Sequence, residues 1–457
     1  MKLIYIPIEV KFRELISKLF FIGSNLNNND IFFIGDKMSA KRATNLFGEG
    51  IYFYKSINHN DTVHINRIKS KGNIYFSQDV EGGALMNNSY TFQSFLKYRS
   101  SSKNVNLVDK IFTWGDFDHK EWKKKYKIFK NKIFKTGEPR TDLWRKDVYN
   151  KIFKDEIENL RKYQPYFFIP SSFYSSHSYL MEAIKFDKKL TNKTTSISLK
   201  KRIKSKKDSY RNFLKFIQII IKLAKNYPHY KIIIKPHPSE NINSWKKRFN
   251  KKYNDKIIID NRYDLTSYIA GSSCVIFNES TAGIQSIIMG KKTICYDFAN
   301  TLSFRNYANE CVPRVQNFEN LKNLIDRDNY TNEQSRYLKK LKKRFYLTKK
   351  KASNIIFEHF KKIKIKNEIL IHFKYLAKFY GLYYLLSDSI LYYLINLKEM
   401  ISRSHIGYQS HKLKIPGGIE RKEIEKFFIN LGLYKKIKII QFGRNGYFIH
   451  KIKKKEK

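Results

Sequence analysis

The chain has 457 residues, of which 42% are hydrophobic and 16% aromatic, and these proportions exclude an intrinsically disordered protein. The length is enough for two or three domains, each with its own core. Lys and Arg number 90 against 40 Asp and Glu, so the formal net charge is +50. This charge has two interpretations: an anionic partner such as nucleic acid, a membrane face or a phosphorylated substrate, or a general enrichment in Lys, Ile and Asn.

The basic residues are spread along the chain, and neither a zinc-binding Cys/His pattern nor an RNP-type aromatic motif occurs, so we expect no nucleic-acid partner. Three cysteines predict a reducing compartment without a disulfide framework. The first apolar run is too short for a signal peptide, and no window has 18 uncharged apolar residues. The nearest candidate, residues 379–397, contains Asp388 and several tyrosines and is expected to be a buried or interfacial helix. We therefore expect a cytoplasmic protein, which its basic surface could hold at the anionic inner face of the cytoplasmic membrane.

The first third of the sequence alternates short apolar runs with helical patterns, beginning with a strand at residues 3–8 and a helix at 11–21. Further strands are predicted at residues 31–34, 50–54, 73–77, 110–114 and 133–136. Strands that alternate with helices predict a parallel sheet covered on both faces.

A second cycle of the same kind follows Pro165. Its strands are predicted at residues 166–169, 231–234, 256–259, 274–277 and 293–296, and its helices at 208–224, 264–270 and 281–289. The basic, Ser/Thr-rich stretch 191–207 is predicted to be an exposed loop that ends where Asp208 caps the long helix.

From about residue 317 the pattern becomes helical and basic, with an aromatic-rich helix at 365–400, a helix at 420–430 and a terminal hairpin at 437–442 and 447–452. The predicted fold class is α/β: two doubly wound parallel-sheet domains facing a cleft, in the GT-B arrangement of glycosyltransferases, plus a helical basic C-terminal extension. We expect an acceptor-side domain at 1–162, a nucleotide-donor domain at 163–350 and the extension at 351–457.

The segment 235–239, Lys-Pro-His-Pro-Ser, directly follows an apolar strand of the second domain. Loops at the carboxyl ends of such strands bind nucleotides and pyrophosphates. His237 can donate a hydrogen bond to a phosphate or ribose, Pro238 fixes the backbone, and Lys235 adds a positive charge. The alternative is a His that packs at the strand end for structural reasons.

A second strand-end segment, Asn-Glu-Ser-Thr-Ala-Gly at 278–283, follows the strand 274–277. The hydroxyls of Ser280 and Thr281 are candidates to bind a phosphate, although capping of the next helix accounts for one of them. Asn278 and Gln285 are candidates for contacts with ribose or base. Ser172, after the strand 166–169, belongs to the same predicted donor-binding set.

In the first domain, Gln-Asp-Val-Glu-Gly-Gly at 78–83 follows the strand 73–77. A transfer reaction with inversion needs a general base for the acceptor hydroxyl, and Glu81 is the candidate; a plain glycine turn with solvated acids is the alternative. No Asp-x-Asp pair ends a strand, and His and Cys are too scattered for zinc, so we expect no metal and no cofactor.

Further candidates for binding the acceptor or another anion follow the first strand, precede Glu81 in the 78–83 segment or lie at the junction of the two halves. These are Lys11, Arg13, Asp79 and Arg140, with Glu9 beside the first two. For residues 9–13 a solvated helix start is the alternative, and for Arg140 it is a purely structural role at the hinge.

Several of these segments together resemble the bacterial surface carbohydrate biosynthesis protein family. They are residues 6–15, 79–83, 112–115, 136–142, the loop at 235–239, the segment 278–283 and residues 411–417. That family is similar to bacterial sialyltransferases, polysialyltransferases and Kdo transferases, and more distantly to CDP-glycerol glycerophosphotransferases. In the sialyltransferase-like enzymes an acid-acid-Gly motif supplies the base, and a His-Pro motif and a Ser/Thr pair bind CMP.

The resemblance implies that Glu81 is the base, that His237 and Pro238 form the His-Pro motif, and that Ser280 and Thr281 are the hydroxyl pair. Two positions depart from the family pattern: Val80 stands where an acid is usual, and Gln285 where a Glu is expected. The expected function is a metal-independent inverting transfer from a CMP-linked sugar acid, of the sialic, nonulosonic or Kdo type, to a glycan or glycolipid. The alternatives are a CDP-glycerol- or ribitol-type polyol-phosphate transferase and a non-catalytic nucleotide- or glycan-binding protein.

Overall fold

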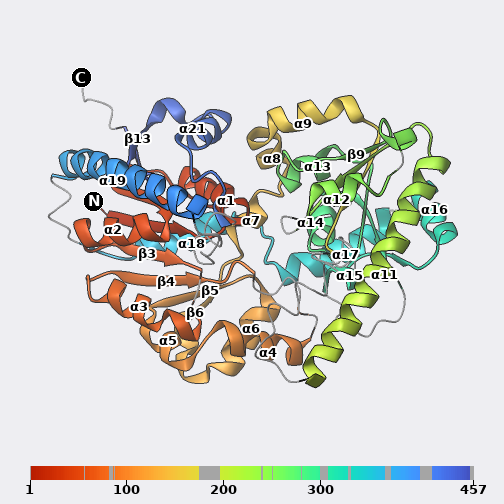
Figure 1. Cartoon of the computed structure of the whole chain (residues 1–457). Helices are drawn as coiled ribbons and strands as arrows, with labels where there is room; N and C mark the ends of the chain where they lie inside the picture. The colour runs from red at the N-terminus through yellow and green to blue at the C-terminus, as the bar shows by residue number, and fades with distance from the viewer. Residues whose placement is uncertain are drawn as a thin grey trace. The chain divides into compact units, whose positions relative to one another are not determined.

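The computed structural model describes residues 2–55, 57–81, 86, 88–173, 196–237, 240–249, 251–278, 280–298, 307–327, 331–365, 372–401 and 414–452. These residues form two compact units, shown in Figure 1. Unit 1 consists of Met1–Leu143 together with Lys342–Lys457, and unit 2 of Trp144–Leu341. The chain therefore leaves the first unit once and returns to it, whereas the sequence placed the boundaries after residues 162 and 350 and a separate extension beyond them.

Unit 1 is built on an 8-stranded sheet in its described part. In sheet order the strands are β13 (Ile437–Gln441), β14 (Gly446–Lys451), β2 (Asp30–Asp36), β1 (Lys2–Ile8), β3 (Ile51–Tyr54), β4 (Ile74–Gln78), β5 (Lys110–Thr113) and β6 (Ile133–Lys135). All neighbouring strands from β2 to β6 are parallel, whereas the β13–β14 hairpin is antiparallel and joins β2 in antiparallel register. The terminal hairpin thus forms within one residue of the predicted bounds and lies at the edge of the sheet of unit 1.

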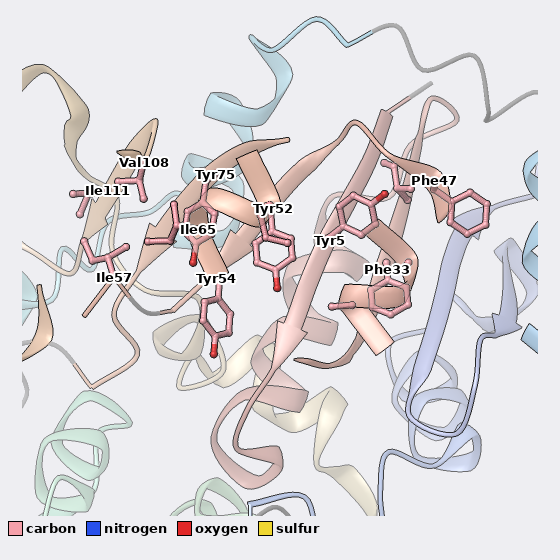
Figure 2. Close-up of a cluster of buried hydrophobic side chains, with 14 of the residues drawn as sticks. Tyr5, Phe33, Phe47, Tyr52, Tyr54, Ile57, Ile65, Tyr75, Val108 and Ile111 are labelled. Carbon is pink, nitrogen blue, oxygen red and sulfur yellow. The ribbon is translucent and has the colours of Figure 1, made fainter. Parts of the chain in front are cut away.

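Helices cover both faces of this sheet, as the alternation of elements predicts. They are α1 (Lys11–Ser24), α2 (Lys37–Phe47), α3 (Thr62–Lys69), α4 (Ser89–Arg99), α5 (Ser102–Leu107), α6 (Asp116–Lys125), α7 (Pro139–Asp142), α18 (Ala352–Lys361), α19 (Phe373–Ile401) and α21 (Arg421–Asn430). On one face, alternate side chains of the strands form an aromatic core that includes Tyr5, Phe33, Tyr52 and Tyr75 (Figure 2).

The opposite face of the sheet shows why the C-terminal residues belong to unit 1. Phe360 of α18 is buried against Phe21 of α1 and against Phe53 and Phe76 of the central strands, with ring centroids 5.2–5.5 Å apart. Buried aromatic pairs of this kind are energetically strong, so α18 closes a core that the first 143 residues leave open.

Unit 2 contains a 6-stranded sheet in its described part, with all pairs parallel. In sheet order its strands are β12 (Arg314–Val315), β11 (Lys292–Tyr296), β10 (Cys274–Phe277), β7 (Tyr166–Pro170), β8 (Lys231–Lys235) and β9 (Ile257–Ile259). Its helices are α8 (Lys146–Ile152), α9 (Lys154–Leu160), α11 (Ser196–Asn226), α12 (Ile242–Lys246), α13 (Leu265–Gly271), α14 (Ala282–Ile288), α15 (Tyr307–Glu310) and α16 (Phe318–Asp326), and α17 (Thr331–Arg344) contains the second boundary.

One prediction in this unit is wrong. The loop expected at residues 191–207 is helical from Ser196 onward, because α11 begins there, and Asp208 lies inside that helix instead of capping it. Lys and Arg have good helix propensity. The first turns of the helix contain only Ile197, Leu199 and Ile203 as apolar residues, which is too few for a clear apolar period. Residues 191–195 lie outside the described part.

Candidate functional site

Three adjacent strands of unit 2 end at one edge of its sheet, and each is followed by a segment that the sequence singled out. The strands lie in the order β10, β7, β8 and are parallel, so their carboxyl ends meet at that edge. The Ser172 hydroxyl, after β7, donates to the backbone oxygen of Asn278, after β10, at 2.9 Å. The backbone N–H of Ser171 donates to the carbonyl of Lys235, which ends β8, at 3.0 Å. Such an edge is where open α/β sheets bind ligands.

The buried carboxylate of Glu240 connects the segments after β7 and β8. It accepts hydrogen bonds from the Ser171 hydroxyl (2.6 Å), the Phe173 N–H (2.6 Å), the Trp245 indole (2.9 Å) and the His237 N–H (3.3 Å). Burial raises the pKa of the Glu240 carboxyl, while the hydrogen bonds from Ser171 and Trp245 oppose that rise. Four donors on one buried acceptor give the two segments a fixed conformation.

His237 itself is half-buried, and its carbonyl accepts a hydrogen bond from the Glu240 N–H at 2.8 Å. Pro238 and Ser239 lie outside the described residues. The ammonium of Lys235 donates to the carbonyl of Tyr263 at 2.8 Å and lies 5.1 Å from the centroid of the Tyr268 ring. Burial lowers the pKa of Lys235. This lysine therefore holds the 261–263 segment, a contact that the sequence did not suggest.

Within the described part of the chain, two polar side-chain groups of the segment after β10 make no hydrogen bond. Asn278 is 6% exposed, and within the described residues its Oδ1 atom is buried and accepts no hydrogen bond. The Thr281 side chain is exposed, and its hydroxyl caps no N–H of α14. Ser280, in contrast, uses its hydroxyl to accept a hydrogen bond from the Ala282 N–H at 3.2 Å. The Asn278 amide oxygen and the Thr281 hydroxyl can therefore each take part in a hydrogen bond with a ligand.

Gln285 lies one turn into α14 and is buried. Its amide donates to the hydroxyl of Thr266 in α13 at 2.9 Å. Gln285 stands where the family pattern has a Glu, and its side chain therefore connects α13 and α14.

In unit 1, Glu81 follows β4 and lies between two arginines. Its carboxylate pairs with Arg13 of α1 through one oxygen and lies 3.6 Å from the guanidinium of Arg99 in α4 through the other. Burial favours a higher pKa for Glu81, but the charges of Arg99 and Arg13 outweigh it and hold the pKa below its usual value. The carboxylate is therefore ionised at neutral pH and is already paired.

The turn that carries Glu81 is held from three sides. The Asp79 carboxylate accepts from the Arg99 Nε at 2.8 Å and from the Glu81 N–H at 2.7 Å. The Trp114 indole donates to the Asp79 carbonyl at 2.6 Å, and Arg140 donates to the Val80 carbonyl at 3.3 Å. The structure thus brings Arg13, Asp79, Glu81 and Arg140 together, whereas Gly82 and Gly83 lie outside the described residues.

Lys11 is engaged elsewhere. Its ammonium donates to the carbonyl of Gly418 at 2.7 Å and pairs with Glu423 of α21 at 2.7 Å.

The Glu9 carboxylate lies 2.7 Å from the ammonium of Lys414 and 3.2 Å from that of Lys55. Burial favours a higher pKa for Glu9, but the two lysines lower it to about 2.

Sequence reasoning missed Glu240 and Arg99. An acid two positions after the His-Pro pair is a signal that could have drawn attention to Glu240. Arg99 gave no such signal, because a basic residue in the last turn of a helix is ordinary.

No family model matches this chain, and the search of curated proteins found no match. Among solved structures, the UDP-GlcNAc 2-epimerase from Neisseria meningitidis bound to UDP-GlcNAc is similar with a TM-score of 0.50 and 11% identity, over 79% of this chain and 100% of that one. A candidate UDP-N-acetylglucosamine 2-epimerase from Listeria monocytogenes gives a TM-score of 0.50 and 11% identity, over 79% and 97%. The wall teichoic acid polymerase TagF gives 0.48 and 12%, over 79% and 88%. The chain therefore has a GT-B-like fold made of two parallel-sheet α/β units.

Proposed function

We propose that this protein is a metal-independent inverting glycosyltransferase of surface polysaccharide biosynthesis that uses a CMP-linked sugar acid as donor. The observation that carries the proposal is the convergence of Ser172, His237 and the 278–281 segment at one edge of a GT-B-like unit. The exposed Thr281 hydroxyl and the buried Asn278 Oδ1 are groups that a nucleotide phosphate and a ribose hydroxyl would satisfy. The choice of cytidine rests on the family resemblance of the sequence.

In the proposed reaction unit 2 binds the donor and Glu81 of unit 1 takes the proton. The acceptor hydroxyl loses its proton to the Glu81 carboxylate, its oxygen bonds to the anomeric carbon, and the bond from that carbon to the phosphate oxygen breaks. CMP leaves with the electron pair. His237, Ser280 and Thr281 hold the phosphate, and losing one such donor would cost about 2.7–4 kcal/mol by analogy with oxyanion donors.

The pairing of Glu81 with Arg13 and Arg99 has a consequence for the acceptor. A carboxylate held by two arginines is a weak base, because the arginines stabilise its ionised form. An acceptor that carries its own carboxylate or phosphate would compete for these guanidinium groups and release Glu81. We therefore propose an anionic glycan or glycolipid as acceptor.

Nucleotide binding is the first test. Thermal unfolding is measured with CMP, CDP, UMP, UDP and GDP, since a ligand at 100 times its Kd stabilises by about 2.7 kcal/mol. We expect a response to CMP that Thr281→Val reduces. Ser273→Ala is the control, because Ser273 is exposed at the opposite end of β10. A response to UDP or GDP without one to CMP contradicts the donor, and a response to CDP alone favours a polyol-phosphate transferase.

Catalysis is the second test. Glu81→Gln is expected to abolish transfer while CMP binding survives, because the proton acceptor is removed and the donor-binding residues of unit 2 are unchanged. Glu358→Gln, in the exposed part of α18, is the control and should leave transfer unchanged. Unaltered turnover in Glu81→Gln would show that another group is the base.

A further inference from the structure

One face of the 29-residue helix α19 is fixed to unit 1. Phe373 and Ala377 are buried in its core, and Gly381 lies so close to β13 that a Cβ there would be 2.4 Å from the Gln441 carbonyl. Asp388 pairs with Arg42 of α2 at 2.6 Å. The helix is therefore anchored from Phe373 to Asp388, and these contacts determine which face points away from unit 1.

The opposite face carries a row of exposed apolar side chains, which we call the α19 stripe. Its members and their exposed fractions are Tyr375 (80%), Phe379 (70%), Leu382 (60%), Tyr383 (58%), Leu386 (58%), Ile390 (62%) and Tyr393 (65%). At 3.6 residues per turn these positions fall within an arc of about 100°. Single exposed apolar residues are ordinary, but an aligned row of this length marks an interaction surface.

Charge indicates what covers the stripe. Lys378 is exposed beside it, and the whole chain has a net charge of +50. Two copies of so basic a chain repel each other, whereas an anionic lipid surface attracts it. Tyrosines are moreover enriched at the level of lipid headgroups, where a ring meets an apolar and a polar layer together.

We propose that the α19 stripe docks unit 1 on an anionic lipid bilayer, with the helix lying in the plane of the interface. Within the described residues no helix has the length and apolar character needed to cross a bilayer, so α19 is assigned to the surface. This inference goes beyond the proposed reaction and does not depend on it.

Vesicle co-sedimentation of the full chain tests the proposal. Vesicles of phosphatidylcholine alone are compared with vesicles that also contain phosphatidylglycerol. We expect binding to the anionic vesicles to be at least about tenfold tighter and to weaken as salt is added, since salt screens the attraction. Equal binding to both compositions, or binding to neither, overturns the proposal.

Variants then locate the surface. Phe379→Glu with Leu386→Glu is expected to reduce vesicle binding at least about tenfold, because two apolar contacts are lost and two like charges face the lipid. Leu382→Gln with Ile390→Gln removes apolar contact without adding charge and should also weaken binding. The control is Val63→Glu with Ile128→Glu, which makes the same change in charge at apolar residues that are 81% and 88% exposed elsewhere in unit 1.

Two results would overturn the assignment. One is that the stripe variants, with circular dichroism and thermal unfolding like the parent chain, bind vesicles as tightly as the control does. The other is that the parent chain sediments as a dimer, the stripe variants sediment as monomers and vesicle binding does not change. In that case the stripe is a contact between two copies.

Discussion

Glu240 accepts hydrogen bonds from the segments after β7 and β8, which carry the proposed donor-binding residues Ser172 and His237. Replacing it by Ala leaves buried donors without an acceptor. We expect Glu240→Ala to lower the free energy of unfolding by about 2–5 kcal/mol, since each buried unsatisfied donor costs about 1–3 kcal/mol. Urea denaturation followed by circular dichroism measures this change.

The control for Glu240 is Glu319→Ala, an exposed acid in α16 of the same unit. Surface substitutions of this kind usually stay within about 0.5 kcal/mol. A Glu240→Ala variant as stable as this control would show that the carboxylate does not hold the two segments.

The ion pair between Arg13 and Glu81 predicts a dependence on pH. The positive charges of Arg99 and Arg13 lower the pKa of Glu81, so the proposed base stays ionised as the pH falls and loses its charge only below its usual value. Arg13→Gln removes one charge and raises that pKa. The acid limb of log kcat/KM should therefore move to higher pH.

Arg161→Gln, an exposed arginine of unit 2 paired with Glu158, is the control for this profile and should leave the acid limb in place. If Arg13→Gln leaves the limb where it was, or moves it to lower pH, the group that titrates is not Glu81.

At the scale of elements, helix α14 can pack on strand β10 only because residue 283 has no side chain. A Cβ at Gly283 would lie 2.2 Å from the ring of Phe277. We expect Gly283→Ala to destabilise unit 2 by about 1–3 kcal/mol, the range for overpacking in a core. It should also weaken CMP binding, because Ser280 and Thr281 lie at the start of this helix.

Chemical denaturation and CMP titration measure the two effects, and a double variant provides the control. Phe277→Leu shortens the ring that causes the clash, so Phe277→Leu with Gly283→Ala should recover part of the lost stability relative to the sum of the single changes. If the stability effects of the two single changes simply add, the contact between residue 283 and the Phe277 ring is not the source of the strain.

The strands were predictable because buried parallel strands are short continuous apolar runs. Residues 274–277 form β10 with the predicted bounds. The two-residue strand β12 has no such run and was missed. The same apolar runs predicted that His237 and Thr281 lie just after strand ends. The role of these two residues in binding stays a prediction. The partners of Glu240 and Arg99 come from other elements, and only the folded chain brings them together. The acid after the His-Pro pair could have pointed to Glu240 but not to its partners, and Arg99 gave no signal at all.

At the scale of the whole molecule, the sequence predicted two α/β halves but not the path of the chain between them. The hairpin of β13 and β14 was visible as a local pattern, whereas its partner β2 lies some 400 residues away in sequence. Such pairing is decided by matching apolar faces and edges, which no local window contains. Unit 1 therefore needs both ends of the chain, and unit 2 is one continuous segment.

This organisation predicts how a nucleotide affects unfolding. All the proposed donor-binding residues belong to unit 2, so a bound nucleotide adds its binding free energy to that unit. If the two units unfold in separate steps, calorimetry of the full chain should show CMP raising one transition temperature and leaving the other in place. Hydrogen exchange should locate the added protection at residues 166–173, 231–237 and 274–290.

Thr281→Val is the matched control for this experiment, because it should reduce the shift of that transition and the protection together. Protection by CMP that is confined to unit 1 would contradict the assignment of the donor to unit 2. It would instead direct attention to the acidic turn at Glu81, where Arg13 and Arg99 are the cations that a nucleotide phosphate would meet.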